Sequence, residues 1–191
     1  PDYRLIRTSM EKPVYKERLR LRCYGVATKD TPAFIEIKKQ YDGIVYKRRV
    51  EMEYEKACRY LNQNLRMADE KEQILREIDY FKEFYKDLKG AMYISYERDA
   101  YHGKENPELR ITFDEKIFYR TDNLTLNTGV YGTDLLSKGE CLMEIKIADA
   151  MPLWLTRILN LPYIEKTSFS KYGRAYENEQ CKKIGLQERR A

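Results

Sequence analysis

The sequence has few of the residues on which nucleophilic and zinc-dependent enzymes depend. Its 191 residues contain a single histidine, His102, and four cysteines: Cys23, Cys58, Cys141 and Cys181. The cysteines form no CxxC pair, so the spacing of a zinc site is missing. A Ser-His-Asp or Cys-His mechanism would have to use His102, and no neighbouring residue supports such a mechanism. We therefore expect His102 to be an exposed loop histidine.

Long apolar runs are also missing. No run approaches the roughly 18 residues of a membrane-spanning helix, and the chain start carries no signal-peptide core. The widely spaced cysteines favour reduced thiols in a cytoplasmic protein. Because the chain begins at Pro1 without a methionine, we expect an N-terminal piece of the domain to be missing. The length predicts a single domain over residues 1–191, with residues 175–191 as a tail or helix.

Charged residues are abundant, and they follow a strand pattern. The net charge of +5 is small because 36 basic residues stand against 31 acidic ones. Apolar and polar residues alternate with a period of two, which predicts strands whose two faces differ. The predicted strands cover residues 3–7, 15–24, 34–41, 45–51, 92–101, 109–114, 117–126 and 142–148. Asp42-Gly43 is a two-residue hairpin turn between two of them.

Helical spacing of apolar residues appears in three other segments. Residues 54–61 and 69–88 predict helices, the second beginning at a capping box of Asp69 and Glu72 and ending before Gly90. Pro152 opens a short apolar helix. We expect the helices to cover the apolar faces of the sheet, which gives an α+β fold.

The polar faces of the predicted strands are mainly cationic. On one strand, Arg18, Arg20 and Arg22 form a row with a spacing of about 6.5–7 Å. Other strands contribute further cations: Lys38, Lys47, Arg49, Arg98, Arg110 and Lys146. The acids among them are few, chiefly Glu36, Glu108, Asp114 and Glu144. On any one strand this is the ordinary solvated side of an antiparallel sheet, but the agreement among strands points to a binding site.

Electrostatics indicates what such a site would bind. Two like charges about 4 Å apart repel by about 4 kcal/mol at an effective dielectric constant near 20. Gathered cations are therefore costly unless a polyanion neutralises them. Arginine suits phosphate because its planar fork binds two oxygens at once. A divalent metal held by Glu144 would complete a phosphate site.

Seven segments in this order resemble a known family. They are LRLRCYG (19–25), FIEIK (34–38), YKRR (46–49), YER (96–98), LRITFD (109–114), MEIK (143–146) and SFSKY (168–172). Together they resemble the VTC domain, the polyphosphate polymerase domain of the vacuolar transporter chaperone proteins and their bacterial relatives. This family lies within the CYTH-like triphosphate tunnel metalloenzymes.

The resemblance implies an antiparallel β-barrel, open at both ends, with helices packed outside. It implies transfer of the ATP γ-phosphoryl group to a growing polyphosphate chain, and a Mn²⁺ or Mg²⁺ ion at Glu144. The family's phosphate-binding positions correspond to Arg20, Arg22, Lys38, Lys47, Arg98, Arg110 and Lys171. The charge pattern adds four further candidates for the phosphate site: Arg18, Glu36, Arg49 and Lys146.

The chain departs from the family pattern at two places. The family's first strand, with a functional lysine, would precede Tyr3. Ser168 stands where the eukaryotic enzymes carry a lysine, for which Lys166 is the nearest substitute. Alternatives are a tripolyphosphatase of the same fold and a non-catalytic binder of polyphosphate or inositol polyphosphate. An RNA-binding protein is a weaker reading, because no strand carries a clustered aromatic platform.

The expected partners are ATP and polyphosphate, without a specific nucleic acid. The expected location is the cytoplasm, including the cytoplasmic face of a membrane if the protein joins a membrane complex.

Overall fold

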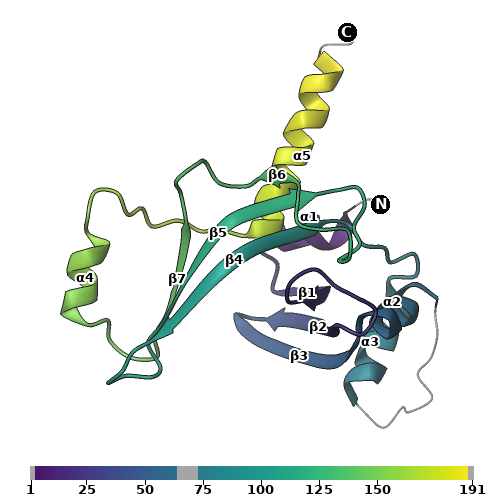
Figure 1. Cartoon of the computed structure of the whole chain (residues 1–191), viewed down its shortest axis with the longest axis horizontal. Coiled ribbons are helices and arrows are strands. Elements are labelled where there is room, and N and C mark those ends of the chain that lie inside the picture. The colour runs from purple at the N-terminus through teal and green to yellow at the C-terminus, as the bar shows by residue number, and fades with distance from the viewer. Residues whose placement is uncertain (1–2, 64–72, 189–191) are drawn as a thin grey trace. The chain divides into compact units, whose positions relative to one another are not determined.

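The computed structural model describes residues 3–63 and 73–188, with the backbone alone for 186–188 (Figure 1). The predicted capping box of Asp69 and Glu72 lies outside these residues. The chain divides into two compact units, which we call unit 1 (Pro1–Tyr93 and Arg120–Val130) and unit 2 (Ile94–Tyr119 and Tyr131–Ala191). This division does not test the prediction of a single domain, which stays a prediction.

Unit 1 contains a three-stranded antiparallel sheet in the order β1-β2-β3. Its strands are β1 (Tyr15–Cys23), β2 (Pro32–Tyr41) and β3 (Ile44–Glu53). The three predicted strands are thus confirmed within one or two residues at most ends. Asp42 and Gly43 join β2 to β3, and both have a positive φ, of 45° and 79°. This is the backbone that a two-residue hairpin turn requires, so the predicted turn is confirmed.

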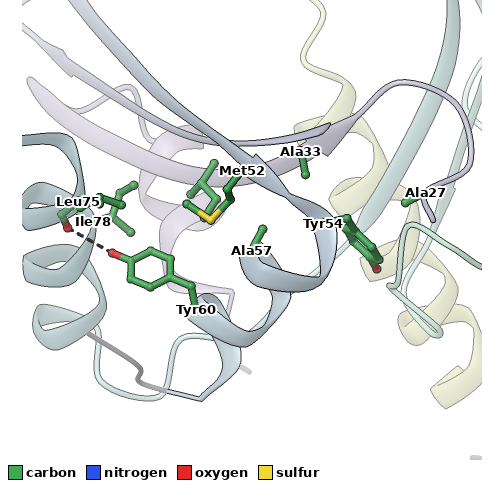
Figure 2. Packing of buried hydrophobic residues seen from close by; sticks show 9 residues of the cluster. Ala27, Ala33, Met52, Tyr54, Ala57, Tyr60, Leu75 and Ile78 are labelled. Atoms are coloured by element: carbon green, nitrogen blue, oxygen red, sulfur yellow. Dashed lines mark hydrogen bonds between the residues drawn. The ribbon is translucent and has the colours of Figure 1, made fainter. Parts of the chain in front are cut away.

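Two helices cover one face of this sheet. They are α2 (Tyr54–Asn62) and α3 (Gln73–Phe84). Figure 2 shows their buried side chains meeting those of the strands; the cluster contains Ala27, Ala33, Ile35, Met52, Tyr54, Ala57, Tyr60, Leu75 and Ile78. The Tyr60 hydroxyl donates to the carbonyl oxygen of Leu75 at 3.2 Å and so links the two helices. The prediction that helices cover the apolar sheet face is confirmed in unit 1.

The start of the chain is a helix, so the predicted strand at residues 3–7 is wrong. The helix α1 spans Arg4–Met10 and buries Ile6. Leu5 and Ile6 are adjacent rather than alternating, and Arg, Leu and Met favour helices. The end of α3 also differs from the prediction, because it stops at Phe84 and Lys86 takes a positive φ of 28°.

Unit 2 is built on a four-stranded sheet in which β5 pairs with each of the other strands. The strands are β4 (Tyr93–His102), β5 (Arg110–Arg120), β6 (Thr133–Asp134) and β7 (Leu142–Lys146). Its helices are α4 (Leu153–Leu159) and α5 (Lys171–Glu188). The C-terminal segment is therefore helical, which is one of the two predicted alternatives.

The segment 109–126 was expected as separate strands, but β5 is a single strand that ends at Arg120. Beyond it the chain folds back around the Arg120 guanidinium, which donates to the carbonyl oxygens of Asn123, Thr125 and Gly129 at 2.9, 3.0 and 3.3 Å. The same guanidinium lies 3.4 Å from the centre of the Tyr93 ring. Residues 121–126 therefore form a loop rather than a strand.

The antiparallel sheets and the helices of residues 3–63 and 73–188 confirm an α+β fold. The pairings of the described strands form two sheets and do not close a barrel, so the barrel stays a prediction. All four cysteines are free thiols. No helix in residues 3–63 and 73–188 combines the length and apolar character that crossing a bilayer requires.

Candidate functional site

The polar face of β1, β2 and β3 gathers the predicted cations of unit 1. In the sheet register, Arg20 pairs with Glu36 and Glu36 pairs with Arg49. One row further, Lys38 lies between Arg18 and Lys47. We call this surface the Glu36 face; it consists of Arg18, Arg20, Arg22, Glu36, Lys38, Lys47 and Arg49. The structure thus brings together seven predicted site residues, six of them cations.

Glu36 is the centre of this face, and its side chain is only 3% exposed. Arg20 holds Glu36 Oε2 with two nitrogens, Nε at 2.9 Å and Nη2. Arg22 Nη2 lies 3.0 Å from Oε1, and Lys47 Nζ lies 3.8 Å from it. Burial alone would raise the pKa of Glu36, but the hydrogen bond and charge of Arg20, with the charges of Arg22 and Lys47, lower it below its ordinary value. Glu36 is therefore ionised at neutral pH.

The cations of the Glu36 face are crowded. Burial lowers the pKa of Lys47, and the charges of Arg20, Arg22 and Arg49 lower it further against the opposing effect of Glu36. Burial and Arg20 likewise lower the pKa of Arg18. Crowded cations favour any anion that neutralises them.

The ring of Phe34 lies close to the guanidinium groups of two of these arginines. The Arg22 and Arg49 guanidinium carbons lie 5.7 and 4.9 Å from the centre of the Phe34 ring. Stacking on a ring leaves the N–H donors at the edge of a guanidinium available. Arg22 Nε is buried and makes no hydrogen bond within the described part of the chain.

Unit 2 repeats this arrangement around Asp114, whose side chain is 1% exposed. Arg98 binds it with two nitrogens, Nε to Oδ1 at 2.5 Å and Nη2 to Oδ2 at 2.7 Å. Lys171, the first residue of α5, also donates to Oδ2. Burial would raise the pKa of Asp114, but the hydrogen bonds from Arg98 and Lys171 lower it. The Tyr96 ring lies beside both cations, 5.0 Å from Arg98 and 4.6 Å from Lys171.

The neighbouring strand β7 adds Glu144 and Lys146 to the same sheet face. Glu144 pairs with Thr112 in the register, and Lys146 pairs with Arg110. Lys146 Nζ lies 3.1 Å from Glu144 Oε1. The pKa of Arg98 is raised, mainly by its hydrogen bond to Asp114 and in part by the charge of Glu144. We call this surface the Asp114 face; it consists of Arg98, Arg110, Thr112, Asp114, Glu144, Lys146 and Lys171.

An open pocket of about 330 Å³ lies beside Arg110. Its lining consists of Ala100, Tyr101, His102, Pro107, Arg110 and Thr112. His102 is exposed as expected, but it ends β4 rather than lying in a loop. No residue in the lining is an acid, so the pocket can accept part of an anionic ligand.

A sequence comparison identifies the family. The model of the VTC domain matches residues 1–179, which is nearly the whole chain. The chain belongs to the VTC domain family. The resemblance seen in the seven segments is therefore confirmed. A comparison with curated proteins finds no significant match.

VTC domains are associated with polyphosphate metabolism, and the two cationic faces of this VTC domain fit such a ligand. Every predicted site residue of unit 1 lies on the Glu36 face. The remaining predicted residues lie on the Asp114 face: Arg98, Arg110, Glu144, Lys146 and Lys171. Whether each of them acts in the reaction stays a prediction.

The metal expected at Glu144 can be tested against the donor atoms near it. Glu144 is 48% exposed, and no group of three His, Cys, Asp or Glu side chains occurs among residues 3–63 and 73–188. The described side chains around Glu144 therefore do not form a complete metal-binding site by themselves. Mg²⁺ commonly uses one or two carboxylates together with phosphate oxygens. Thr112 Oγ1, opposite Glu144, is buried without a hydrogen-bond partner in the described chain, so this pair fits a metal that the substrate helps to bind.

The two acid–arginine pairs of the VTC domain share a spacing that the sequence patterns did not indicate. Arg20 and Glu36 are separated by 16 residues, as are Arg98 and Asp114. The second pair follows the first by 78 positions (98 minus 20, and 114 minus 36). At the same offset, four residue types are shared: Tyr15 with Tyr93, Gly25 with Gly103, Lys38 with Lys116, and Tyr41 with Tyr119.

Asp114 lies at the centre of the Asp114 face; the sequence analysis placed it on the polar face of a strand but did not select it for the site. Its match to Glu36 at this offset was the available signal. The matches are few and scattered among unlike residues, which is why the alternation of apolar and charged residues did not reveal them.

Proposed function

We propose that this VTC domain is a polyphosphate polymerase that transfers the γ-phosphoryl group of ATP to a polyphosphate chain and releases ADP. The observation that carries the proposal is the Glu36 face, where six cations surround a single buried carboxylate. Such an excess of positive charge supports a ligand with many negative charges close together. Polyphosphate has one on each repeating unit.

The chemistry requires positioning and charge neutralisation rather than a protein nucleophile. A terminal phosphate oxygen of the polyphosphate chain attacks the γ-phosphorus and forms a new P–O–P bond. The bond from the γ-phosphorus to the β,γ-bridging oxygen breaks, and its electron pair leaves with ADP. The attacking oxygen is already ionised, so no histidine is needed as a base.

Each face has its own cations for binding phosphate. Within unit 1, Arg20, Arg22 and Lys47 would bind phosphate groups. Within unit 2, Arg98, Arg110 and Lys171 would bind phosphate groups. Glu144 with Thr112 would hold Mn²⁺ or Mg²⁺, which would supply charge neutralisation on the phosphate oxygens. The open pocket beside Arg110 supports a nucleotide substrate, because its mainly apolar lining suits a nucleoside.

The test is to incubate the protein with ATP, Mn²⁺ and a short polyphosphate primer, and to measure ADP and chain length. We expect ADP and longer polyphosphate to form together. The matched variants are Arg110→Ala and Lys116→Ala, which each remove one cation from β5. Lys116 is ion-paired with Glu97 and lies away from the pocket, so only Arg110→Ala should raise the KM for ATP, by about tenfold.

Two other outcomes would assign the protein to the alternatives. Orthophosphate without longer chains would indicate a hydrolase of triphosphates. Thermal stabilisation by polyphosphate or inositol polyphosphate without ATP turnover would indicate a binding protein. We place the activity in the cytoplasm, including the cytoplasmic face of a membrane through a partner complex; the free thiols support a reducing compartment.

A further inference from the structure

Both cationic faces contain a carboxylate where a phosphate-binding surface should exclude one. Glu36 lies on the central strand of its sheet, and Asp114 lies on β5, the strand to which the other three of its sheet pair. Both are almost fully buried, and both stay ionised because neighbouring cations lower their pKa. A fixed negative charge there repels an incoming phosphate. Its presence on both faces, 78 positions apart, requires an explanation.

We propose that Glu36 and Asp114 are positioning residues that orient the phosphate-binding cations. In both pairs the arginine uses the same edge of its guanidinium, Nε and Nη2, to hold the acid. A guanidinium has five N–H donors, so the donors of Nη1 remain outside this contact and can bind a phosphate oxygen. The acid thereby determines that the Nη1 edge of the guanidinium is the one that faces a bound phosphate.

Each acid also collects cations from different elements of its own unit. Glu36 lies near Arg22 of β1 and Lys47 of β3, and Asp114 binds Lys171 of α5. Long side chains that are already ordered lose less entropy when the ligand binds. Each carboxylate therefore weakens the electrostatic attraction of its face for phosphate but holds the cation side chains in a fixed geometry. Both oxygens of each acid lie within ion-pair distance of a cation.

The proposal rests on the proposed function only in requiring that the faces bind phosphate. The direction in which Glu36→Gln changes the affinity for tripolyphosphate tests it. Glu36→Gln removes one negative charge from the Glu36 face. If charge alone matters, tripolyphosphate should bind more tightly to this variant. If Glu36 positions Arg20, binding should weaken by about tenfold or more, the size of one charge-assisted hydrogen bond. Isothermal titration of the full chain with tripolyphosphate measures the affinity.

The matched control is Glu51→Gln. Glu51 pairs with Phe34, so it lies on the same sheet face, but it is exposed. Its loss changes the net charge by the same amount, and we expect equal or slightly tighter binding. A purely structural role of Glu36 would lower the melting temperature without weakening the affinity of the folded protein.

A double-mutant cycle separates positioning from a general loss of order. Arg20→Lys keeps the charge but cannot hold Glu36 with two nitrogens. Adding Glu36→Gln to it should cost less than twofold, because the two residues act as a unit. Asp114→Asn gives the same test in unit 2 if Glu36→Gln does not fold, and it too should weaken binding.

Equal or tighter binding by Glu36→Gln, or by Asp114→Asn where it replaces that variant, would overturn the proposal and leave the proposed function in place. Additive losses in the cycle would also overturn it. Failure of the unsubstituted protein to bind tripolyphosphate would overturn the proposed function, and this inference with it.

Discussion

At the scale of single residues, Glu36 and Asp114 stay ionised although both are buried. Burial disfavours a carboxylate, so the surrounding cations must lower its pKa for the charge to persist. Each acid is stabilised by an arginine that binds with two nitrogens and by further cations, Arg22 and Lys47 at Glu36 and Lys171 at Asp114. The same contacts link the pH dependence of stability to the geometry of the Glu36 face and the Asp114 face.

We expect the protein to lose stability as the pH falls through the acidic range. The folded pKa of each acid lies below its unfolded value of about 4, so the ion pairs contribute fully above that value. Between the unfolded and the folded pKa, the unfolded chain binds protons more readily than the folded protein, so the contribution of the ion pairs to stability decreases. Below the folded pKa it is lost. Melting temperatures measured between pH 6 and pH 3 should fall.

Asp114→Asn provides the comparison for this pH effect. The variant should melt at a lower temperature than the unsubstituted protein at pH 6, and the gap should narrow toward pH 3. A gap that stays constant with pH would show that Asp114 does not contribute as an ionised group.

At the scale of elements, α3 supports the Glu36 face from behind the sheet. It buries Leu75, Ile78 and Phe81. Its Glu77 also pairs with Arg48 at 2.7 Å and with Lys39 at 3.7 Å. These two cations belong to the helix-covered side of the sheet and not to the Glu36 face. Alternation along the strands thus places some cations on the Glu36 face and others on the side of the sheet that the helices cover.

Truncation within α3 should separate stability from binding. Ile78→Ala removes a fully buried side chain, and we expect the free energy of unfolding to fall by about 2–5 kcal/mol. Tyr80→Ala on the same helix is the control, because Tyr80 is 66% exposed and its loss should cost less than about 1 kcal/mol. Urea denaturation measures both values. Similar losses in the two variants would contradict the packing of α3 described here.

The elements also show what the sequence could and could not predict. Alternation over residues 18–23 of β1 and 35–38 of β2, together with the Asp42-Gly43 turn, made these strands and their shared polar face predictable. The helix α1 was not, because Leu5 and Ile6 are too short an apolar run to show a period. The end of β5 depends on hydrogen bonds from Arg120 to a loop that follows it. The contact of Lys171 with Asp114 spans 57 residues, and no local pattern encodes it.

At the scale of the whole molecule, a net charge of +5 conceals a separation of charge. Cations dominate the polar faces of the strands, whereas helices carry acids such as Glu55, Glu77 and Glu179. Two anion-binding faces can therefore exist in a protein of modest net charge. Long-range attraction to a polyanion depends on this local density of charge.

Salt should accordingly affect binding more than folding. Raising the ionic strength from 50 to 300 mM shortens the screening length to about half or less, and we expect tripolyphosphate affinity to fall by roughly tenfold or more. The melting temperature without ligand should change little, because the core in Figure 2 is apolar. Titrations and thermal melts at both salt concentrations measure the two effects. An affinity independent of salt would contradict an electrostatic site.

Arg120 shows that a basic residue in this chain can have a structural role instead of binding an anion. Its donors are committed to the backbone turn that follows β5, and its flat surface is covered by a tyrosine ring. An anion that bound this guanidinium would compete with the backbone carbonyl oxygens that it already contacts. In related chains, an arginine whose donors already bind backbone carbonyl oxygens should therefore not be counted as a phosphate-binding residue. We expect only the number of the other arginines to increase with the length of phosphate chain bound.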